Sequence, residues 1–459
     1  MRIIICGAGQ VGFGIAERLA TEGHDVSVID VSPRLIANVR DQLDVRGVVG
    51  HGSHPDVLAA AGAADADLLI AVTQADEVNM VAAQVAHTIF QVPTKIARVR
   101  AQSYLSPIYR HFFARNQMPI DVVISPEIEV GEMVLRRLAL PGAVETVRFA
   151  DDNVVVVGIM CQEDCPVVDT PLRQLTELFP NLGAVVVGAF RGGHLFVPQS
   201  EDMLRVGDLR LRRRAARSSV RRTLVIFGHE EPKAARVVIA GGGNIGFYVA
   251  QQLEKREPGT RVKIIEASRT RALEIADTLH RAVVLNGSAL DQDLLREADI
   301  EEADTLVALT NDDQANIITC VMAKTLGCDR NLSLINNVSY PAFANALGID
   351  AYVNPRAVTI SRVLRHVRRG RIESVHSLQN GQAEVIEAEA LETSPLVGRN
   401  LRDLDLPAGT RIGAVYRRGQ PLEINGDTQI LAKDRVIMFA LADKVHQVEQ
   451  MFRVSLEFF

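Results

Sequence analysis

The strongest constraint on this chain is a glycine-rich unit that occurs twice. The first copy consists of the apolar run Arg2–Cys6, the turn Gly7-Ala-Gly-Gln-Val-Gly12, a helical segment, the strand Val26–Ile29 and Asp30. The second copy has the same order, with Arg236–Ala240, Gly241-Gly-Gly-Asn-Ile-Gly246, a helical segment, Arg261–Ile265 and Glu266. Strand, glycine turn, helix, strand and acid in this order predict a dinucleotide-binding βαβ unit. The duplication therefore predicts two Rossmann lobes in one chain.

Each glycine of such a turn has a physical reason. Gly7 permits the tight turn, Gly9 lets the backbone approach a pyrophosphate, and Gly12 lets the helix pack closely on the strand. The helix that follows presents unpaired N–H groups to phosphates. Asp30 is placed to accept hydrogen bonds from an adenosine ribose and to repel the additional phosphate of NADP. The alternative is a glycine turn with a structural role alone, since the short motif by itself is weak evidence.

Further repeats extend the two lobes. Val48–Ser53 is repeated as Val283–Ser288, and Ala66–Thr73 as Ala303–Thr310, with Asn79 and Asn316 at equal spacing after the threonines. More strands are expected at Lys95–Val99, Val122–Ser125, Leu332–Ile335 and Tyr352–Asn354, and helices at Glu127–Arg137 and Ala357–Arg368. This alternation predicts an α/β fold in which each lobe is a doubly wound parallel sheet with helices on both faces.

A shorter repeat follows each Rossmann lobe. Gly183–Gly193 corresponds to Gly409–Gly419, and both segments read as short strands joined by glycine-rich turns. We therefore predict four parts: Rossmann lobes at residues 1–140 and 235–370, and small α+β lobes at residues 141–230 and 371–459. A length of 459 residues is sufficient for three or four domains.

Composition limits the classes of function. A net charge of -6 gives no sign of general nucleic-acid affinity, and no apolar stretch reaches the roughly 18 residues that a membrane helix requires. The N-terminus leads directly into a strand, so no cleavable signal is expected and a cytoplasmic location follows. The five cysteines are scattered, which favours thiols in a reducing compartment. Cys161 and Cys165 lack the further ligands that a zinc site needs.

Together these motifs resemble the TrkA family, the regulatory subunits of bacterial Trk potassium uptake systems. The resemblance covers essentially all of the chain. It is carried by the first glycine turn, Gly52-Ser-His-Pro-Asp-Val-Leu58, Ile70–Thr73, Asp76–Met80, Pro93–Arg100 and Ile412–Arg417. It implies two RCK (also called KTN) units per chain, each with a nucleotide-binding lobe and a C-terminal lobe. It also implies a ring of RCK units, expected from four chains, under a membrane-embedded transport subunit on the inner face of the membrane.

The resemblance implies NAD(H) in the first lobe and NAD(H) or ATP/ADP in the second. In the first lobe the implied binding residues are Gly7, Ala8, Gly9, Gln10, Val11, Asp30, Gly52, Ser53, Thr73, Gln74 and Arg98. In the second lobe they are Gly241, Gly243, Asn244, Ile245, Glu266, Gly287 and Thr310. The second lobe has no clear equivalent of Arg98, since its strand continues Leu334-Ile-Asn336-Asn337. Arg269 is interpreted as a solvated arginine at a helix start, or else as a residue that tolerates a further phosphate. No catalytic residues are expected.

Other features leave alternatives open. An NAD-dependent oxidoreductase is the main competing function, but the small lobes offer no recognisable catalytic arrangement of His, Lys or Tyr. A DNA-binding redox sensor lacks a helix-turn-helix signal. The basic run Arg210–Arg217, followed by Arg221 and Arg222, is interpreted as a solvated edge strand and then a helix. The alternatives are a docking surface for a partner or anionic lipid and, last, for nucleic acid, with which no aromatic residues interleave here. His51 and His54 lack further metal ligands, so no metal site is expected. Ile108, Phe112 and Phe113 are interpreted as contacts to a neighbouring subunit.

Overall fold

The computed structural model describes residues 1–114, 116–151, 153–161, 165–179, 185–192, 194–206, 208–214, 217–230, 232–337, 339–367, 372–378 and 381–452. The chain divides into two compact units, each built from two segments. One unit comprises Met1–Leu135 and Ala234–Val367, and the other comprises Arg136–Lys233 and Arg368–Phe459. The first unit contains both parallel sheets and the second contains both antiparallel sheets.

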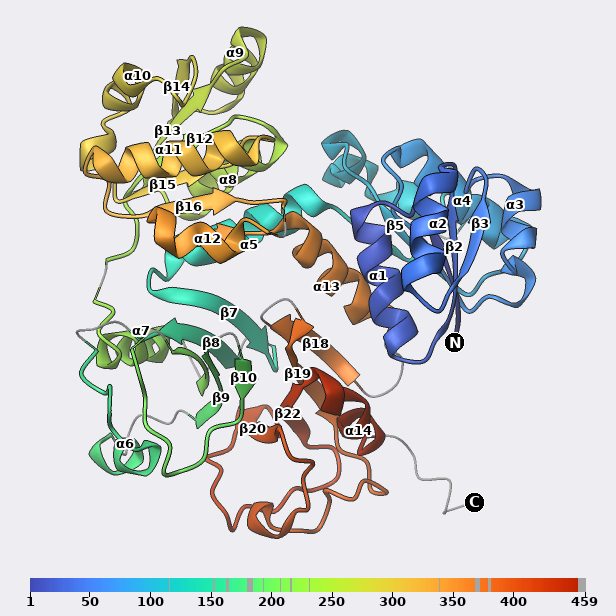
Figure 1. Cartoon of the computed structure of the whole chain (residues 1–459), viewed down its shortest axis with the longest axis vertical. Helices are drawn as coiled ribbons and strands as arrows, with labels where there is room; N and C mark the ends of the chain where they lie inside the picture. Colours follow the sequence, from blue (N-terminus) through green and yellow to red (C-terminus); the bar gives the residue numbers. More distant parts are fainter. Residues whose placement is uncertain are drawn as a thin grey trace. The chain divides into compact units, whose positions relative to one another are not determined.

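The first Rossmann lobe is a six-stranded sheet in the order β3-β2-β1-β4-β5-β6 (Figure 1). Its strands pair in parallel and are β1 (Arg2–Cys6), β2 (Asp25–Asp30), β3 (Arg46–Val49), β4 (Leu68–Ala71), β5 (Thr94–Arg98) and β6 (Val122–Ile124). Its helices are α1 (Gln10–Thr21), α2 (Pro33–Gln42), α3 (Pro55–Ala60) and α4 (Asp76–Thr88), with short 3-10 helices η1 (Ala63–Asp65), η2 (Gln102–Leu105) and η3 (Pro107–Phe113). The predicted doubly wound order is confirmed.

Two apolar clusters cover the two faces of this sheet. One contains Ile3, Ile5 and Val28 with Ile15 and Leu19 of α1, and the other contains Ile4, Leu69 and Met80 among others. Phe112 and Phe113 pack against this second cluster, and Phe112 stacks on Tyr104 at 5.8 Å between ring centroids. Both rings are half-buried and contact the core of their own lobe, and their contact to a neighbouring subunit stays a prediction. Ile108 is exposed, and its role stays a prediction.

The second Rossmann lobe repeats the first, with the strand order β14-β13-β12-β15-β16-β17. Its strands are β12 (Arg236–Ala240), β13 (Arg261–Glu266), β14 (Val283–Asn286), β15 (Thr305–Ala308), β16 (Asn331–Leu334) and β17 (Ala351–Val353). Its helices are α8 (Asn244–Arg256), α9 (Arg269–Thr278), α10 (Gln292–Glu297), α11 (Asp313–Thr325) and α12 (Pro341–Ala344), with 3-10 helices η5 (Ile300–Glu302) and η6 (Asn345–Leu347). Both predicted parallel sheets are present.

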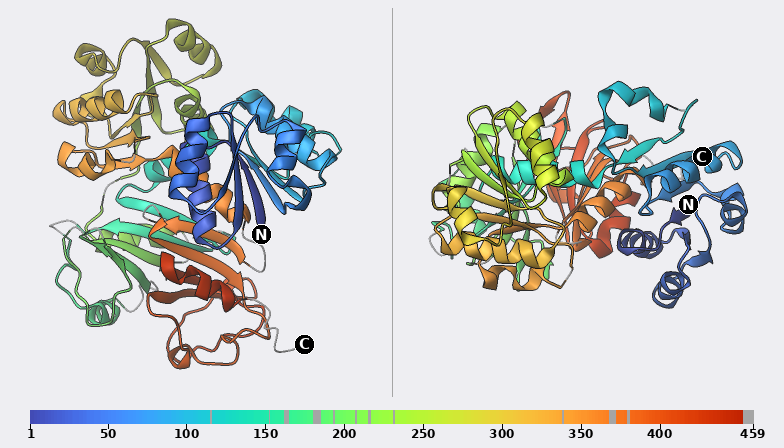
Figure 2. Two further views of the ribbon diagram at one scale, coloured as in Figure 1. Left: turned by 45° about the vertical axis from the view of Figure 1, so that its right-hand side comes forward. Right: turned by 90° about the horizontal axis from the view of Figure 1, so that it is seen from above.

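The last helix of each Rossmann segment packs on the other lobe. α13 (Pro355–Val367) follows β17 of the second lobe, yet Val363, Leu364 and Val367 belong to the core cluster of the first lobe. In Figures 1 and 2 α13, drawn in orange, lies beside α1, drawn in dark blue. α5 (Pro126–Ala139) follows β6 of the first lobe and contacts α8 through Glu132 and Tyr248. The core of the first lobe is therefore completed by α13, and the second lobe is contacted by α5.

The second unit contains two five-stranded antiparallel sheets. One has the order β10-β9-β11-β8-β7 and the other β18-β19-β22-β20-β21. The strands of the first are β7 (Ala143–Phe149), β8 (Val154–Met160), β9 (Val185–Arg191), β10 (His194–Phe196) and β11 (Leu209–Arg214). Those of the second are β18 (Ile372–Leu378), β19 (Ala383–Glu389), β20 (Thr410–Arg417), β21 (Gln420–Pro421) and β22 (Arg435–Leu441). The helical elements are α6 (Leu172–Leu178), α7 (Arg217–Ile226), α14 (Val445–Gln450), η8 (Leu401–Asp403) and η9 (Ala442–Lys444).

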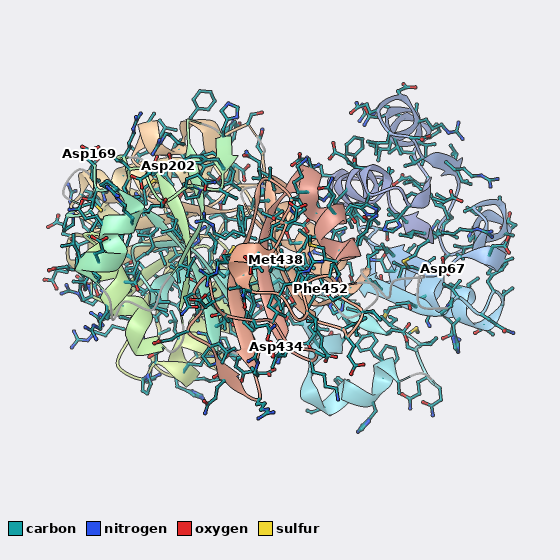
Figure 3. The ribbon with its side chains drawn as sticks, turned by 90° about the horizontal axis from the view of Figure 1, so that it is seen from below. Asp67, Asp169, Asp202, Asp434, Met438 and Phe452 are labelled. Carbon is teal, nitrogen blue, oxygen red and sulfur yellow. The ribbon has the colours of Figure 1, made fainter. Side chains whose placement is uncertain are left out.

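The two antiparallel sheets share one hydrophobic core. A single cluster joins Val156 and Val187 of the first small lobe to Val385, Ile437 and Phe439 of the second. Each sheet also has a private cluster, which in the second lobe includes Met438 and Phe452, labelled in Figure 3. The small lobes therefore form a β-sandwich within one chain.

The basic strand of the first small lobe is not an edge strand. β11, which carries Arg210, Arg212 and Arg214, pairs with β8 on one side and β9 on the other. The edge-strand interpretation is therefore wrong, because both sides of this backbone are used in the sheet. The helix expected after it is present as α7.

Candidate functional site

The first glycine turn has the backbone shape that the sequence requires. Gly7 adopts φ +109°, which favours glycine, and its N–H donates to the Ile29 carbonyl at 2.7 Å. A Cβ atom at Gly12 would lie 1.7 Å from the Gly7 carbonyl oxygen, so no larger residue fits there. A Cβ at Gly9 would meet no atom within 4 Å. The turn therefore has no room for a side chain at Gly12, whereas the space beside Gly9 is open.

The open side of the turn faces the start of α1. Gly9 is the N-cap residue and supplies no side-chain cap, so the first N–H groups of this helix have no side-chain acceptor at the cap. Gly9 and Gln10 are exposed, Val11 is half-buried and Ala8 is buried. An open glycine surface at a helix N-terminus has the shape and the partial positive charge that suit a phosphate group. The residues present therefore fit a dinucleotide or nucleotide phosphate.

Asp30 lies at the end of β2 beside this turn. Its two carboxylate oxygens accept hydrogen bonds from the Ala8 N–H at 2.7 Å and the Ser32 N–H at 2.8 Å. These bonds fix the carboxylate beside the open face of the glycine turn, and this region of the lobe is called its crevice below. Each carboxylate oxygen retains a further lone pair. The half-buried Asp30 can therefore accept a ribose hydroxyl, as predicted for an acid at this position.

The ends of β4 and β5 form the adjoining wall. The Thr73 N–H and hydroxyl both donate to the Asn79 side-chain oxygen, at 2.8 and 2.7 Å. The fully buried Asn79 amide donates in turn to the carbonyls of Thr73 and Arg98. The Arg98 guanidinium donates to the Thr73 carbonyl at 2.6 Å, and burial lowers the pKa of Arg98. Gln74 is exposed at this strand end.

The remaining predicted residues of the first lobe lie beyond β3. Gly52 is buried, and a Cβ added there would lie 3.2 Å from the Cys6 sulfur. The Ser53 hydroxyl and the His51 Nδ1 are 2.8 Å apart. His51 stacks on His54 with 4.7 Å between ring centroids. Close packing under Gly52 explains the glycine, and the histidines contact each other and a serine.

The second lobe reproduces this framework. Gly241 has φ +103°, a Cβ at Gly246 would lie 2.0 Å from the Gly241 carbonyl oxygen, and Gly243 is open. The Glu266 carboxylate accepts from the N–H groups of Gly242 at 2.7 Å and Ser268 at 2.8 Å. The exposed Asn244 and the half-buried Ile245 begin α8. Two crevices of the same construction are therefore present.

The strand-end wall of the second lobe is also repeated. Thr310 donates to the buried Asn316 through its N–H and its hydroxyl. The Asn316 amide donates to the carbonyls of Thr310 and Leu334. Gly287 is half-buried, and a Cβ there would lie 2.6 Å from the Leu294 side chain. Leu334 occupies the place of Arg98, so the second crevice lacks that cation.

Three side chains that contact the glycine turns or the strand ends were not assigned to these places from the sequence. Asn79 and Asn316 build the strand-end walls, and their equal spacing after the threonines was the available signal. In the second lobe Arg271, rather than the exposed Arg269, contacts the turn: its Nε donates to the Gly242 carbonyl at 3.1 Å. Its guanidinium also lies 5.2 Å from the centre of the Phe247 ring. Arg271 is therefore the cation held at this crevice.

Across the described residues there is no group of three or more His, Cys, Asp or Glu placed to hold a metal ion. All five cysteines are buried thiols, and burial raises the pKa of Cys6 to about 12, which keeps this thiol protonated and unreactive near pH 7. No helix in the described part of the chain is long and apolar enough to cross a membrane.

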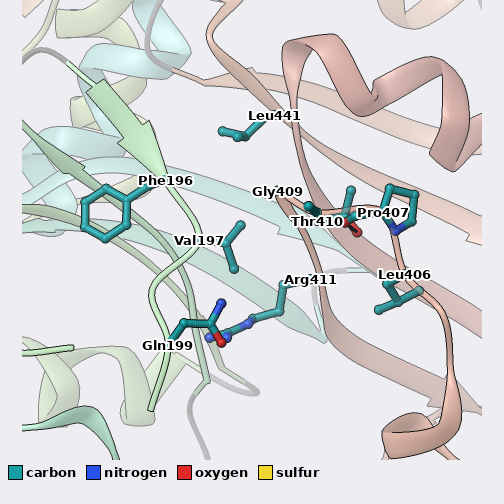
Figure 4. Close-up of a pocket in the computed structure, with 10 residues that line it drawn as sticks. Phe196, Val197, Gln199, Leu406, Pro407, Gly409, Thr410, Arg411 and Leu441 are labelled. Atoms are coloured by element: carbon teal, nitrogen blue, oxygen red, sulfur yellow. Dashed lines mark hydrogen bonds between the residues drawn. The ribbon is translucent and has the colours of Figure 1, made fainter. Parts of the chain in front are cut away.

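A separate cavity of about 470 Å³ lies between the two small lobes (Figure 4). Phe196, Val197 and Gln199 line it from one lobe, and Gly409, Thr410 and Arg411 from the other. The Arg411 guanidinium donates to the Val186 carbonyl at 2.9 Å, and burial lowers the pKa of Arg411. This bond ties the two sheets of the sandwich together.

The small lobes also repeat one ion pair. Arg191 makes two hydrogen bonds to the buried Asp208, and Arg417 makes two to the buried Asp434, all at 2.7 or 2.8 Å. These bonds raise the pKa of both arginines. The paired arrangement explains why arginine and aspartate recur at matching places in the two halves of the sequence.

Solved structures similar to this chain share its fold. The RCK domain of the GsuK channel matches with a TM-score of 0.61 and 19% identity, over 98% of this chain and 94% of that one. A structure described as the GsuK channel bound to NAD matches with a TM-score of 0.60 and 18% identity, over 98% of this chain and 78% of that chain. The chain therefore shares the fold of the GsuK RCK domain.

Sequence relatives are much closer. The TrkA-N domain model matches residues 3–126 and 237–355, and the TrkA-C domain model matches residues 385–453. The Trk system potassium uptake protein TrkA of Azorhizobium caulinodans is 61% identical over the full length of both chains. That of Halomonas elongata is 42% identical, also over the full length of both. With two glycine crevices, two small lobes and identity of this extent from end to end, the chain belongs to the TrkA family of Trk system potassium uptake proteins, which is not a family of enzymes.

Proposed function

We propose that this chain is a nucleotide-binding regulatory subunit that gates a membrane-embedded Trk-type potassium transporter. The observation that carries the proposal is the duplicated crevice, open above Gly9 and Gly243 and bordered by Asp30 and Glu266. The chain is similar over its full length to Trk system potassium uptake proteins, so the proposed partner is the transport subunit of such a system. Binding at the crevices is the means by which a cytoplasmic chain can act on that partner.

In the first lobe the proposed ligand is NAD(H). The pyrophosphate would lie at Gly7, Ala8, Gly9, Gln10 and Val11, the ribose at Asp30, and the remainder along Gly52, Ser53, Thr73, Gln74 and Arg98. The arginine supplies a positive charge at the strand end where the ligand carries negative charge. When bound, the dinucleotide serves as a ligand that reports its own concentration, and none of the residues named here needs to transfer a proton.

In the second lobe the proposed ligand is NAD(H) or ATP/ADP. Gly241, Gly243, Asn244, Ile245, Glu266, Gly287 and Thr310 supply the same binding groups. Leu334 replaces the strand-end cation, whereas Arg271 adds one at the turn. The second lobe therefore has its cation at the glycine turn instead of at the strand end, which favours a ligand whose phosphates extend past the turn.

Regulation requires that a nucleotide bind two shapes of the protein with different affinity. A ligand shifts such an equilibrium only by this difference, for which about 1–3 kcal/mol is typical. We propose that the chains form a tetrameric ring at the inner face of the cell membrane, attached through the transport subunit and without nucleic acid. We also propose lobe boundaries at residues 1–140, 141–230, 235–370 and 371–459.

The test uses glycines as matched positions. Gly9→Ala and Gly243→Ala place a methyl group where a pyrophosphate would approach, yet the free protein has no atom within 4 Å of either Cβ. Gly259 is equally open in a loop away from both crevices, so Gly259→Ala is the control. Calorimetry with NADH, NAD, ATP and ADP would be combined with potassium flux through the transporter and the full chain.

We expect each crevice variant to lose binding at one lobe with an unchanged melting temperature, and the double variant to lose the response of flux to nucleotides. Gly259→Ala should behave as the native chain. If the double variant still responds to nucleotides, the crevices are not the regulatory sites. If no nucleotide binds the native chain, the proposed function is wrong.

A further inference from the structure

The last helix of each Rossmann lobe contacts the other lobe, and we call this arrangement the helix exchange. A lobe can form it with the other lobe of its own chain (unlike pairing) or with the same lobe of a second copy of the chain (like pairing). α13 of the second lobe packs on α1 of the first, and α5 of the first lobe contacts α8 of the second. Because the lobes share one fold, the same helix exchange is sterically available between two first lobes from two copies of the chain. Something must make pairing of the unlike lobes better than pairing of the like lobes.

In each of the two helix contacts a glycine on one helix faces a large side chain on the other. The glycine is on the helix after the turn (α1) in the first contact and on the exchanged helix (α5) in the second. A Cβ at Gly14 of α1 would lie 2.5 Å from the Ile360 Cδ1 of α13. A Cβ at Gly131 of α5 would lie 2.4 Å from the Tyr248 Cδ1 of α8. The large side chain of one helix therefore occupies the space left by the glycine of the other. Neither glycine position has room for a methyl group.

These four positions are equivalent in pairs. Gly14 and Tyr248 each lie two residues after the last glycine of their turn, and Gly131 and Ile360 each lie five residues after the proline that starts their helix. In the first contact the gap is on the Rossmann helix, whereas in the second contact it is on the exchanged helix. Pairing of like lobes would place Gly14 against Gly131, which leaves a void, and Tyr248 against Ile360, which overlap.

Charged groups beside the second contact follow the same rule. The Glu132 carboxylate accepts hydrogen bonds from the Tyr248 hydroxyl at 2.7 Å and from Arg256 at 2.7 and 3.0 Å. The residue of α1 equivalent to Arg256 is Glu22, since both lie ten residues after the last glycine of the turn. Pairing of two first lobes would therefore oppose Glu132 to Glu22, two like charges.

We propose that these contacts select the partner of each Rossmann lobe: Gly14 with Ile360, Gly131 with Tyr248, and Glu132 with Arg256 join unlike lobes and reject the like lobe of a second copy of this chain. The selection acts through packing and charge at the exchanged helices, independently of whether a nucleotide is bound.

The test removes the difference in side-chain size between Gly14 and Tyr248 and between Ile360 and Gly131. In the double variant Gly14→Tyr with Ile360→Gly, both Rossmann helices carry tyrosine and both exchanged helices carry glycine, so like and unlike contacts become equally well packed. Glu22→Cys with Glu132→Cys is added to the full-length chain as a reporter, because these positions face each other only in like pairing. The reporter is treated with a short bismaleimide and analysed on a denaturing gel.

We expect little cross-linking between copies in the native background, and at least a tenfold increase in cross-linked dimer when the size difference is erased. Glu132→Cys with Arg256→Cys is the positive control, since it reports unlike pairing. Equal cross-linking between copies in both backgrounds would overturn the proposal, and so would its absence from both when the positive control reacts. The native cysteines are buried, which keeps the background low.

A second measurement decides the matter if the double variant fails to fold. Gly131→Ala should lower the melting temperature by several degrees, and Tyr248→Ala in the same chain should restore more than half of the loss. Gly14→Ala should be restored in the same way by Ile360→Ala and not by Tyr248→Ala. Additive effects in the matched pairs would show that the contacts are not coupled, and the proposal would fail.

Discussion

The two Rossmann lobes keep the same backbone turn and differ in the charge around it. Both have a left-handed glycine, a last glycine without room for a methyl group, and a carboxylate that accepts two backbone N–H bonds. The cation, however, is Arg98 at the strand end of the first lobe and Arg271 beside the turn of the second. The glycines and the carboxylate, which the lobes share, determine the shape of the turn. The cation, which differs, is expected to determine which ligand each lobe prefers.

The largest expected effect is on the shared turn. Gly12→Ala and Gly246→Ala each force a methyl group to within 2.0 Å or less of a carbonyl oxygen, so we expect the loss of at least about 3 kcal/mol of folding free energy. Urea unfolding of each variant would measure it. Gly9→Ala, in open space, is the control; an equal loss there would mean that the contacts under Gly12 are not the cause.

The buried amides that hold the strand ends come next. Asn79→Ala and Asn316→Ala leave two backbone carbonyls and a threonine without their partner, so each should cost about 2–4 kcal/mol. The similar contacts predict similar losses in the two lobes, measured by thermal unfolding. Gln84→Ala removes only an exposed hydrogen bond to Thr88 and should have almost no effect. A large difference between the two lobes would contradict the equivalence.

The acids at the end of the second strand should affect ligand affinity. Asp30→Ala removes the proposed ribose acceptor, and loss of a hydrogen bond to a charged group should weaken NADH binding by about 1.5–3 kcal/mol, roughly tenfold to a hundredfold. Glu266→Ala should weaken binding at the second lobe in the same way. Calorimetry measures both, and unchanged affinity would remove the substituted acid from its site.

Exchange of the differing cation should produce a smaller and selective change. Arg98→Leu makes the strand end of the first lobe resemble the second, and we expect NADH affinity there to fall by about tenfold, or about 1.4 kcal/mol. Arg271→Leu should weaken only the second lobe. Titration of each variant with NADH and ATP checks this assignment. A loss at the wrong lobe would show that the charges act on stability rather than on the ligand.

The smallest effect near neutral pH concerns Cys6, which occupies the position of Ala240. Burial raises the pKa of this thiol to about 12, above its ordinary value of 9.0. Since the folded pKa is the higher one, the stabilisation is present below about pH 9 and is lost as the pH rises toward 12. Cys6→Ala should therefore flatten the loss of stability between pH 9 and pH 11, measured by urea unfolding. An unchanged slope would mean that the thiol is not buried.

Much of this architecture could be predicted because its determinants are local. Gly7, Gly12 and the alternating apolar strands fix the turn and the sheet through backbone geometry, and the repeat supplied an internal check. The basic strand β11 was misplaced because charge favours an edge, whereas sheet order depends on distant strands.

The exchanged helix lay further beyond the reach of sequence analysis. The apolar spacing of α13 showed that Val363 and Val367 need a buried partner, but not that this partner is the first lobe. Arg271 was missed for a related reason: two arginines stand near the start of α9, and only the direction of the side chain shows which one reaches Gly242. The spacing of apolar residues shows which face of a helix is buried. Which element covers that face depends on tertiary packing.

The helix exchange has a consequence for how the protein is made. Val363, Leu364 and Val367 complete the core of the first lobe, yet the ribosome adds them only after the first small lobe and the whole second parallel sheet have been translated. At typical elongation rates this delay is on the order of ten seconds to a minute. Throughout that time the nascent first lobe exposes the apolar groove that α13 later fills, so a chaperone that shields it during synthesis should raise the yield of folded protein.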